Sequence, residues 1–239
     1  MILAFLFGAI SLLYATVGQA GGTAFLALMA FASFTPQEMR PTALALNIVA
    51  AMCSTLIFNW GRLVDWRKLW PLLSASVPTT LVGALIVLPE GTYKAITGLV
   101  LILAAAVLII RRKRDAVQSA QLPIWGSITT GAAVGFVSGL TGVGGGVFLA
   151  PILIAFRWAS PKETSALSAP FILANSTVGL LGTMIVGQRP SAYTLMYGVA
   201  AAAGAIIGTA IGIRWLSENL TRYVLAAMLA AAGFQLLLV

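Results

Sequence analysis

The sequence predicts an all-α polytopic membrane protein made of two inverted-topology repeats, each with about five hydrophobic segments. Apolar residues make up 60% of the chain and charged residues 8%, against about 45–50% and about 25% in soluble domains. So few charges could not cover the surface of a soluble protein. The third observation is an internal duplication, because the second half repeats the order of segments, caps and loops of the first.

The first repeat is predicted to occupy residues 1–111. Apolar segments at 1–17 and 23–34 flank a glycine-rich break at 18–22. As a single helix these 34 residues would run about 51 Å, too long for a hydrocarbon core of about 30 Å. They therefore form a hairpin or two spans. Residues 1–22 lack the basic start of a signal peptide and are expected to be retained.

A helix-start signal follows at Thr35-Pro36-Gln37-Glu38, with threonine as cap and proline at the first helical position. The apolar part of this helix is expected to open at Pro41 and to reach Trp60. Further segments are predicted at 69–88 and 93–110.

The second repeat is predicted at 123–239, after a polar cytoplasmic linker at 112–122. Its segments lie at 125–140, 147–156, 161–186, 193–213 and 221–239. Ser160-Pro161-Lys162-Glu163 repeats the helix-start signal of the first half. Glu38 and Glu163 are therefore expected to act as helix caps.

The basic residues predict the orientation of the chain in the inner membrane. With the linker in the cytoplasm, eleven basic residues face the cytoplasm and three, Arg40, Lys94 and Arg189, face outside. Both termini then lie outside, and Arg40 is expected at the surface. Since the net charge of +8 lies in short loops, it is explained by orientation, and no nucleic-acid partner is expected.

Two glycine-rich stretches occupy matching places in the two halves. Leu140-Thr141-Gly142-Val143-Gly144-Gly145-Gly146-Val147 has a weaker echo at Thr16-Val17-Gly18-Gln19-Ala20-Gly21-Gly22-Thr23. Glycine costs about 1 kcal/mol per residue against alanine in a helix, so each helix is expected to stop there. A helix that restarts after such a break offers free N–H groups and a positive dipole end, which suits a small anion. The alternative is that these glycines only permit close helix packing.

The amides of Asn47 and Asn175, one in each long capped helix, need partners inside a bilayer. They either donate to a substrate or cross-link helices. The predicted substrate-binding residues are Gly18, Gln19, Gly21, Gly22, Thr23, Asn47, Thr141, Gly142, Gly144, Gly145, Gly146 and Asn175.

The chain lacks the groups that other chemistries need. No acid or lysine lies in the middle of a predicted span, there is no histidine, and Cys53 is the only cysteine. This argues against a cation carrier and against a nucleophile–base pair or a metal site in the bilayer. No catalytic residue, metal or cofactor is expected.

The glycine-rich stretches and the duplicated layout of the chain resemble those of the TauE/SafE sulfite exporter family of bacterial and archaeal membrane permeases. The resemblance rests on Gly142-Val143-Gly144-Gly145-Gly146 followed by Pro151, on its degenerate copy at 18–22, and on Gly204-Ala205-Ile206-Ile207-Gly208. The first copy differs by Ala20 in place of Gly144 and Ala27 in place of Pro151. The resemblance implies export or uptake of small sulfur-containing anions such as sulfite, sulfoacetate or related organosulfonates.

The favoured hypothesis is a secondary transporter that moves such an anion, or another organic acid, by alternating access. A passive anion channel and, less favoured, a membrane-embedded enzyme subunit are the alternatives. The expected partners are the small anion and the lipid bilayer. The coupling ion, a proton or sodium, and a homodimeric state stay open at this point.

Overall fold

The computed structural model describes residues 1–87 and 123–217, together with individual positions within 91–106 and 219–234. The predicted linker at 112–122, and most of the predicted segments at 93–110 and 221–239, lie outside the described residues. All regular structure in the described part is helical, which agrees with the predicted class. The helices are α1 (Ile2–Ala15), α2 (Gly22–Phe31), α3 (Pro36–Trp60), α4 (Trp66–Ala84), α6 (Ile124–Thr141), α7 (Gly146–Ala155), α8 (Pro161–Ile185) and α9 (Thr194–Trp215).

Three helices of the described part are long and apolar enough to cross a membrane: Gln37–Trp60 within α3, Pro161–Ile185 and Thr194–Trp215. Helices α1, α2 and α7 are apolar but shorter. Large apolar side chains stay exposed along α9, among them Leu195, Val199 and Ile207. Such exposure would be unfavourable in water and is typical of a surface that faces lipid.

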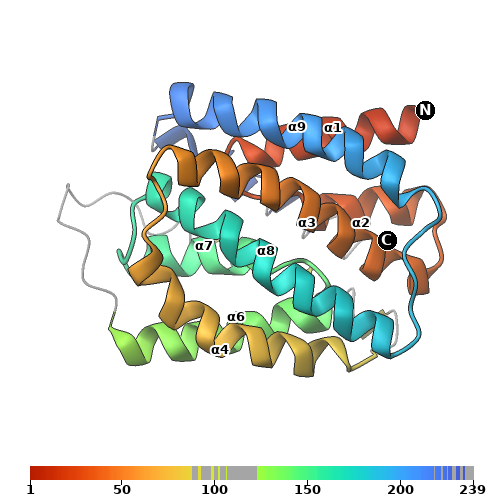
Figure 1. Ribbon diagram of the computed structural model, residues 1–239, viewed down its shortest axis with the longest axis horizontal. Helices are drawn as coiled ribbons and strands as arrows, with labels where there is room; N and C mark the ends of the chain where they lie inside the picture. The colour runs from red at the N-terminus through yellow and green to blue at the C-terminus, as the bar shows by residue number, and fades with distance from the viewer. Residues whose placement is uncertain are drawn as a thin grey trace.

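The helices pack as two outer pairs around a central pair (Figure 1). The long helices α3 and α8 lie side by side in the middle, α9 lies with α1 on one side, and α4 lies with α6 on the other. The two short helices α2 and α7 pack against α3 and α8, respectively. The apolar core includes Phe7, Phe25, Leu149 and Phe171, all fully buried.

Glycines spaced every four residues bring the outer pairs into close contact, as expected where helix association depends on packing rather than on water. In each case a side chain would run into backbone of the partner segment. Gly131, Gly135 and Gly139 of α6 face Leu72, Ser76 and Thr80 of α4. Gly204, Gly208 and Gly212 of α9 face Gly8 and Leu12 of α1 and Thr16, the residue that follows α1.

We therefore expect Gly208→Leu to destabilise the protein by about 3 kcal/mol, because inserted atoms would force α9 away from the Leu12 backbone. Ala210→Leu is the matched control, since it adds the same side chain on an exposed face of the same helix. Thermal unfolding in detergent measures the difference. Equal melting temperatures for the two variants would contradict this packing.

Helix caps fix where the long helices begin. Ser160 and Glu163 form the predicted capping box of α8: the Glu163 carboxylate accepts from the Ser160 N–H at 2.8 Å. The Glu38 carboxylate accepts from the Thr35 hydroxyl at 2.9 Å. The interpretation of Pro41 as an opening residue is corrected, because α3 begins at Pro36, where a missing N–H costs nothing, and Pro41 lies inside the helix.

Candidate functional site

Both glycine stretches interrupt the helices, as predicted. The chain leaves α1 at Ala15 and re-enters a helix at Gly22, and it leaves α6 at Thr141 and re-enters a helix at Gly146. The breaks use left-handed backbone that favours glycine, with φ of 110° at Gly21 and 82° at Gly145, the N-cap residues of α2 and α7. The two breaks thus share one local design.

The breaks meet inside the protein. The Gln19 side-chain amide donates to the carbonyl oxygen of Gly146 at 3.4 Å, and the Asn47 amide donates to that of Val143 at 3.1 Å. A methyl group built on Gly22 would lie 2.6 Å from the Val143 oxygen and 2.5 Å from the Asn47 nitrogen. Asn47 therefore lies between the first break and the second.

Helices α2 and α7 both begin at this meeting point without a side-chain cap. The first N–H groups of a helix have no acceptor within that helix. These N–H groups and the positive dipole ends of α2 and α7 therefore converge in the interior. Gly22 and Gly146, the first residues of the two helices, are both buried.

Four buried polar atoms around the meeting point have no hydrogen-bond partner in the described part of the chain: Gln19 Oε1, Asn47 Oδ1, Ser138 Oγ and Ser176 Oγ. None of these residues is more than 2% exposed. A methyl built on Gly144 would lie 2.7 Å from Ser176 Oγ, one on Gly145 3.2 Å from Ser138 Oγ, and one on Gly146 2.7 Å from Gln19 Oε1.

We call this arrangement the central site; it comprises Gln19, Gly22, Asn47, Ser138, residues 144–146 and Ser176. Leaving buried polar groups unpaired costs about 1–3 kcal/mol each. Such groups are rare in folded proteins and require an explanation. Their concentration where two uncapped helices begin is typical of a place that receives a polar ligand.

The other predicted residues are engaged with the protein. Thr23 shares a hydrogen bond of 3.2 Å with the Tyr14 hydroxyl, and Thr141 donates to Val137 within α6. Gly18 packs on the backbone of Ser165.

Asn175 differs from Asn47 in its surroundings. Its nitrogen donates to the Phe171 carbonyl at 2.9 Å, and its oxygen accepts from the Thr80 hydroxyl at 2.6 Å. The bond to Phe171 lies within α8, and the bond from Thr80 joins α8 to α4, which corresponds to the cross-linking alternative. Asn175 lies fourteen residues after the start of α8, whereas Asn47 lies eleven residues after the start of α3, so the two amides are not equivalent.

Arg40 corrects the expectation of a surface role, because it is only 7% exposed. Its guanidinium donates to the carbonyl oxygens of Gly139 at 2.8 Å, Ile86 at 3.3 Å and Ala84 at 3.5 Å. These carbonyls lie at the C-terminal ends of α6 and α4, where helix dipoles are negative and acceptors are left over.

The stem of Arg40 covers Gly142, since a methyl on that glycine would lie 3.3 Å from Arg40 Cγ. A permanent positive charge therefore lies beside the second break. The sequence analysis missed this residue and Ser138. The available signal for Ser138 was its place one turn before Gly142, at the end of an apolar helix.

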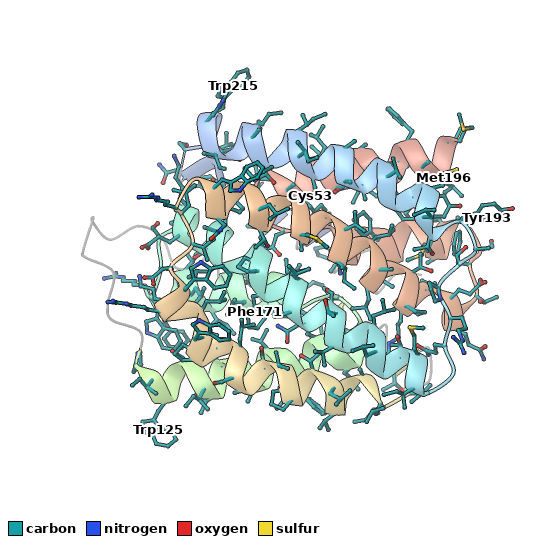
Figure 2. All side chains as sticks on the ribbon, in the orientation of Figure 1. Cys53, Trp125, Phe171, Tyr193, Met196 and Trp215 are labelled. Carbon is teal, nitrogen blue, oxygen red and sulfur yellow. The ribbon has the colours of Figure 1, made fainter. Side chains whose placement is uncertain are left out.

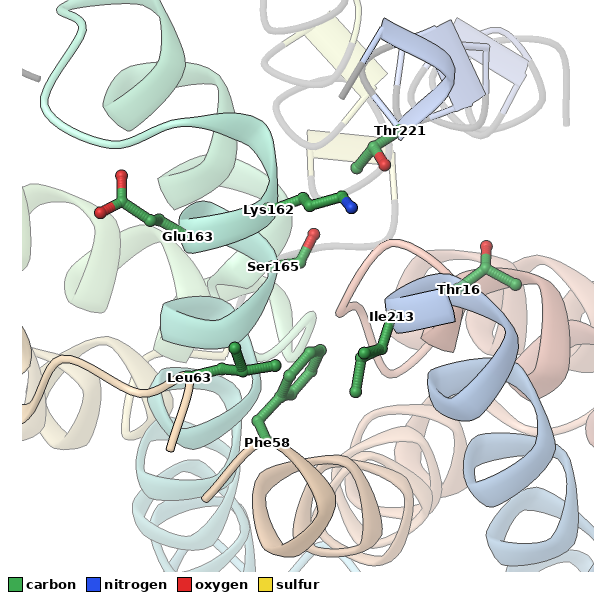
Figure 3. A pocket seen from close by; sticks show the side chains of 9 residues that line it. Thr16, Phe58, Leu63, Lys162, Glu163, Ser165, Ile213 and Thr221 are labelled. Atoms are coloured by element: carbon green, nitrogen blue, oxygen red, sulfur yellow. The ribbon is translucent and has the colours of Figure 1, made fainter. Parts of the chain in front are cut away.

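A pocket of about 220 Å³ opens beside the first break (Figure 3). The Lys162 side chain extends across it toward Thr221, while the Glu163 carboxylate points away and pairs with Lys68 at 3.4 Å. Ser165, in the pocket wall, also backs Gly18. The remaining lining residues are Thr16, Phe58, Leu63, Gly212 and Ile213. We call it the Lys162 pocket.

Comparison with known proteins agrees with this architecture. The family model described as "Sulfite exporter TauE/SafE" matches residues 2–236. The "Probable membrane transporter protein y4hK" of Sinorhizobium fredii is 37% identical over 243 residues, covering 98% of this chain and 97% of that protein. The "Probable membrane transporter protein YunE" of Bacillus subtilis is 24% identical over 227 residues, covering 87% and 83%. No solved structure matches the chain.

The match to the family spans nearly the whole chain, and the described helices are apolar and expose apolar side chains. The names of the relatives indicate transport rather than catalysis. The chain therefore belongs to the TauE/SafE sulfite exporter family and is a membrane-embedded transporter, not an enzyme.

Proposed function

We propose that the chain is a secondary transporter that moves a small anion, sulfite or an organosulfonate or related organic acid, across the inner membrane by alternating access. The observation that carries this proposal is the convergence of two uncapped helix N-termini, those of α2 and α7, on buried polar groups. Free N–H groups and aligned dipoles favour negative charge. Arg40, buried beside the second break, adds to the positive electrostatic potential there.

The proposed mechanism uses two inverted repeats, at 1–111 and 123–239, that rock against one another around the central site. Matching lengths support the repeats: α2 and α7 have 10 residues each, and α3 and α8 have 25 each. The packing supports a two-fold relation between the halves, because α1 of the first repeat packs on α9 of the second, and α6 of the second packs on α4 of the first.

The proposed orientation places the Lys162 pocket and the linker on the cytoplasmic side and both termini outside. Trp125 and Trp215 lie at the same end of the molecule in Figure 2, while Tyr193 lies at the opposite end. Tryptophan at a membrane boundary supports this assignment of the interface. Phe58 and Leu63 line the pocket near the C-terminal end of α3, and Ile213 does so near the C-terminal end of α9.

We expect Lys162→Gln to raise the KM for anion uptake from the pocket side roughly threefold to tenfold without changing the maximal rate, because the lysine raises the local anion concentration. Lys162 forms no ion pair with a described residue, and its side chain lines the pocket. High salt should remove the effect. Arg67→Gln is the control, since Arg67 is exposed and lies outside the pocket. An equal KM for both variants would contradict the role of the pocket.

Flux measurements in proteoliposomes test the function itself. Purified protein is expected to take up labelled sulfite with saturation, and unlabelled anion inside the vesicle should drive counterflow of labelled anion. Uptake that does not saturate and shows no counterflow would indicate a channel. No flux of any small anion would contradict the proposal.

A further inference from the structure

The buried side-chain amide oxygens of Asn47 and Gln19 indicate which ligands the central site can bind. Val143 O and Gly146 O are carbonyl oxygens and can only accept hydrogen bonds. The NH2 groups of Asn47 and Gln19 must therefore face them, as they do at 3.1 and 3.4 Å. The orientation of both amides is fixed by this requirement. Asn47 Oδ1 and Gln19 Oε1 are left as buried acceptors without a donor in the described part of the chain.

An anion that only accepts hydrogen bonds cannot satisfy these two oxygens. Its negative oxygens suit the N–H groups at the starts of α2 and α7, but its lone pairs would face those of the amides. Ser138 and Ser176 do not decide the matter, because a hydroxyl either donates or accepts.

A cation would satisfy the amide oxygens but not the rest of the site. Two positive dipole ends converge there, and Arg40 is buried beside Gly142. No aspartate or glutamate of the described residues belongs to the central site: Asp65 and Glu163 cap helices, and Glu38 bonds to Thr35. A bare metal cation is thus disfavoured.

From this pairing of donors and acceptors we infer that the central site selects monoanions that also carry an O–H or N–H donor, and rejects anions that only accept. This inference rests on the proposed anion site and names its ligand class: hydroxylated or amino-bearing sulfonates and singly protonated oxyanions. The backbone N–H groups bind the negative group, while Asn47 Oδ1 and Gln19 Oε1 bind the donor.

The inference also implies that protons move with the substrate without a membrane carboxylate. A singly protonated oxyanion carries its own proton, so each anion that crosses moves one proton in the same direction. The acceptors at Asn47 and Gln19 then ensure that the protonated form is the one transported. No titratable side chain of the central site takes part.

Calorimetric titration of purified protein with 2-hydroxyethanesulfonate and propane-1-sulfonate tests the inference. The two probes have the same charge and nearly the same shape, and differ by a hydroxyl in place of a methyl. An unpaired buried polar group weakens binding roughly tenfold or more. We therefore expect the hydroxylated probe to bind at least about tenfold more tightly to the wild type.

Substitutions of Gln19 and Asn47 test whether their amide oxygens cause this selectivity. Gln19→Met removes one acceptor without adding charge and should reduce the ratio of the two affinities to below about threefold, with propane-1-sulfonate still bound. Asn47→Leu is the second such variant and covers the case in which the first fails to fold. Thr177→Val is the control, because Thr177 is exposed and bonds only to Leu173 of its own helix.

Equal affinities of the two probes in the wild type would overturn the inference and leave the proposed anion transport intact. A ratio that survives both Gln19→Met and Asn47→Leu would overturn it as well. If neither probe binds, the anion site itself is contradicted, so the two failures are distinguishable.

Discussion

Replacing Gly144 with alanine is expected to lower the rate of anion transport roughly tenfold to hundredfold, because overpacking costs about 1–3 kcal/mol and each 1.4 kcal/mol is about tenfold. The added methyl would lie 2.7 Å from Ser176 Oγ and 3.0 Å from the Asn47 amide nitrogen and from Ile172 Cγ2. It would therefore displace side chains of the central site that are proposed to bind the substrate. Initial uptake rates in proteoliposomes measure the effect.

Gly187 provides the matched control for this prediction. Its φ of 86° is close to the 89° of Gly144, so alanine meets the same backbone strain at both positions. A methyl on Gly187 would have nothing within 4 Å. Gly187→Ala should lose only the stability that backbone strain costs and keep transport within about twofold of the wild type. If folded Gly144→Ala transports as fast as Gly187→Ala, the substrate does not pass through the central site.

Replacing Arg40 with leucine is expected to destabilise the protein by about 3–5 kcal/mol, because each buried acceptor left without a donor costs about 1–3 kcal/mol. The guanidinium serves three carbonyl oxygens, those of Gly139, Ala84 and Ile86, and leucine would leave them without this donor. Arg40→Lys keeps the charge but not the planar fork, so an intermediate loss is expected. Unfolding followed by tryptophan fluorescence measures both variants.

Arg189→Leu is the control for Arg40, since it removes the same charge from an exposed loop position. It should change stability by less than about 0.5 kcal/mol. Equal stability of the Arg40 and Arg189 variants would show that Arg40 does not tie α4 to α6. Transport by folded Arg40→Lys then reports how far the positive charge beside Gly142 matters to the anion.

The sequence was sufficient to predict features that depend on local chemistry. Glycine in runs does not favour a helix, so both breaks were predicted to within a residue of where α2 and α7 begin. The start of α8 could be predicted for the same reason, because Ser160 and Glu163, three residues apart in the chain, form its capping box.

Features that depend on tertiary contacts could not be predicted in this way. Arg40 was assigned to the surface because nothing in the sequence brings the ends of α4 and α6 to it. In the sequence, Asn47 and Asn175 occupy similar places in the two capped helices. In the structure, their distances from the helix start differ by three residues, and they have different partners. Ser138 became a candidate only because its buried hydroxyl has no partner among the described residues and lies beside Gly145.

A structure of the protein with bound selenite tests the central claim most directly, because selenium is located by its anomalous scattering. We expect the selenium to lie between Gly22 and residues 144–146, so that the selenite oxygens reach the backbone N–H groups. Asn47 and Ser176 should lie beside the ion. Selenium found only in the Lys162 pocket or at the surface, with the central site closed by its own side chains, would contradict the account.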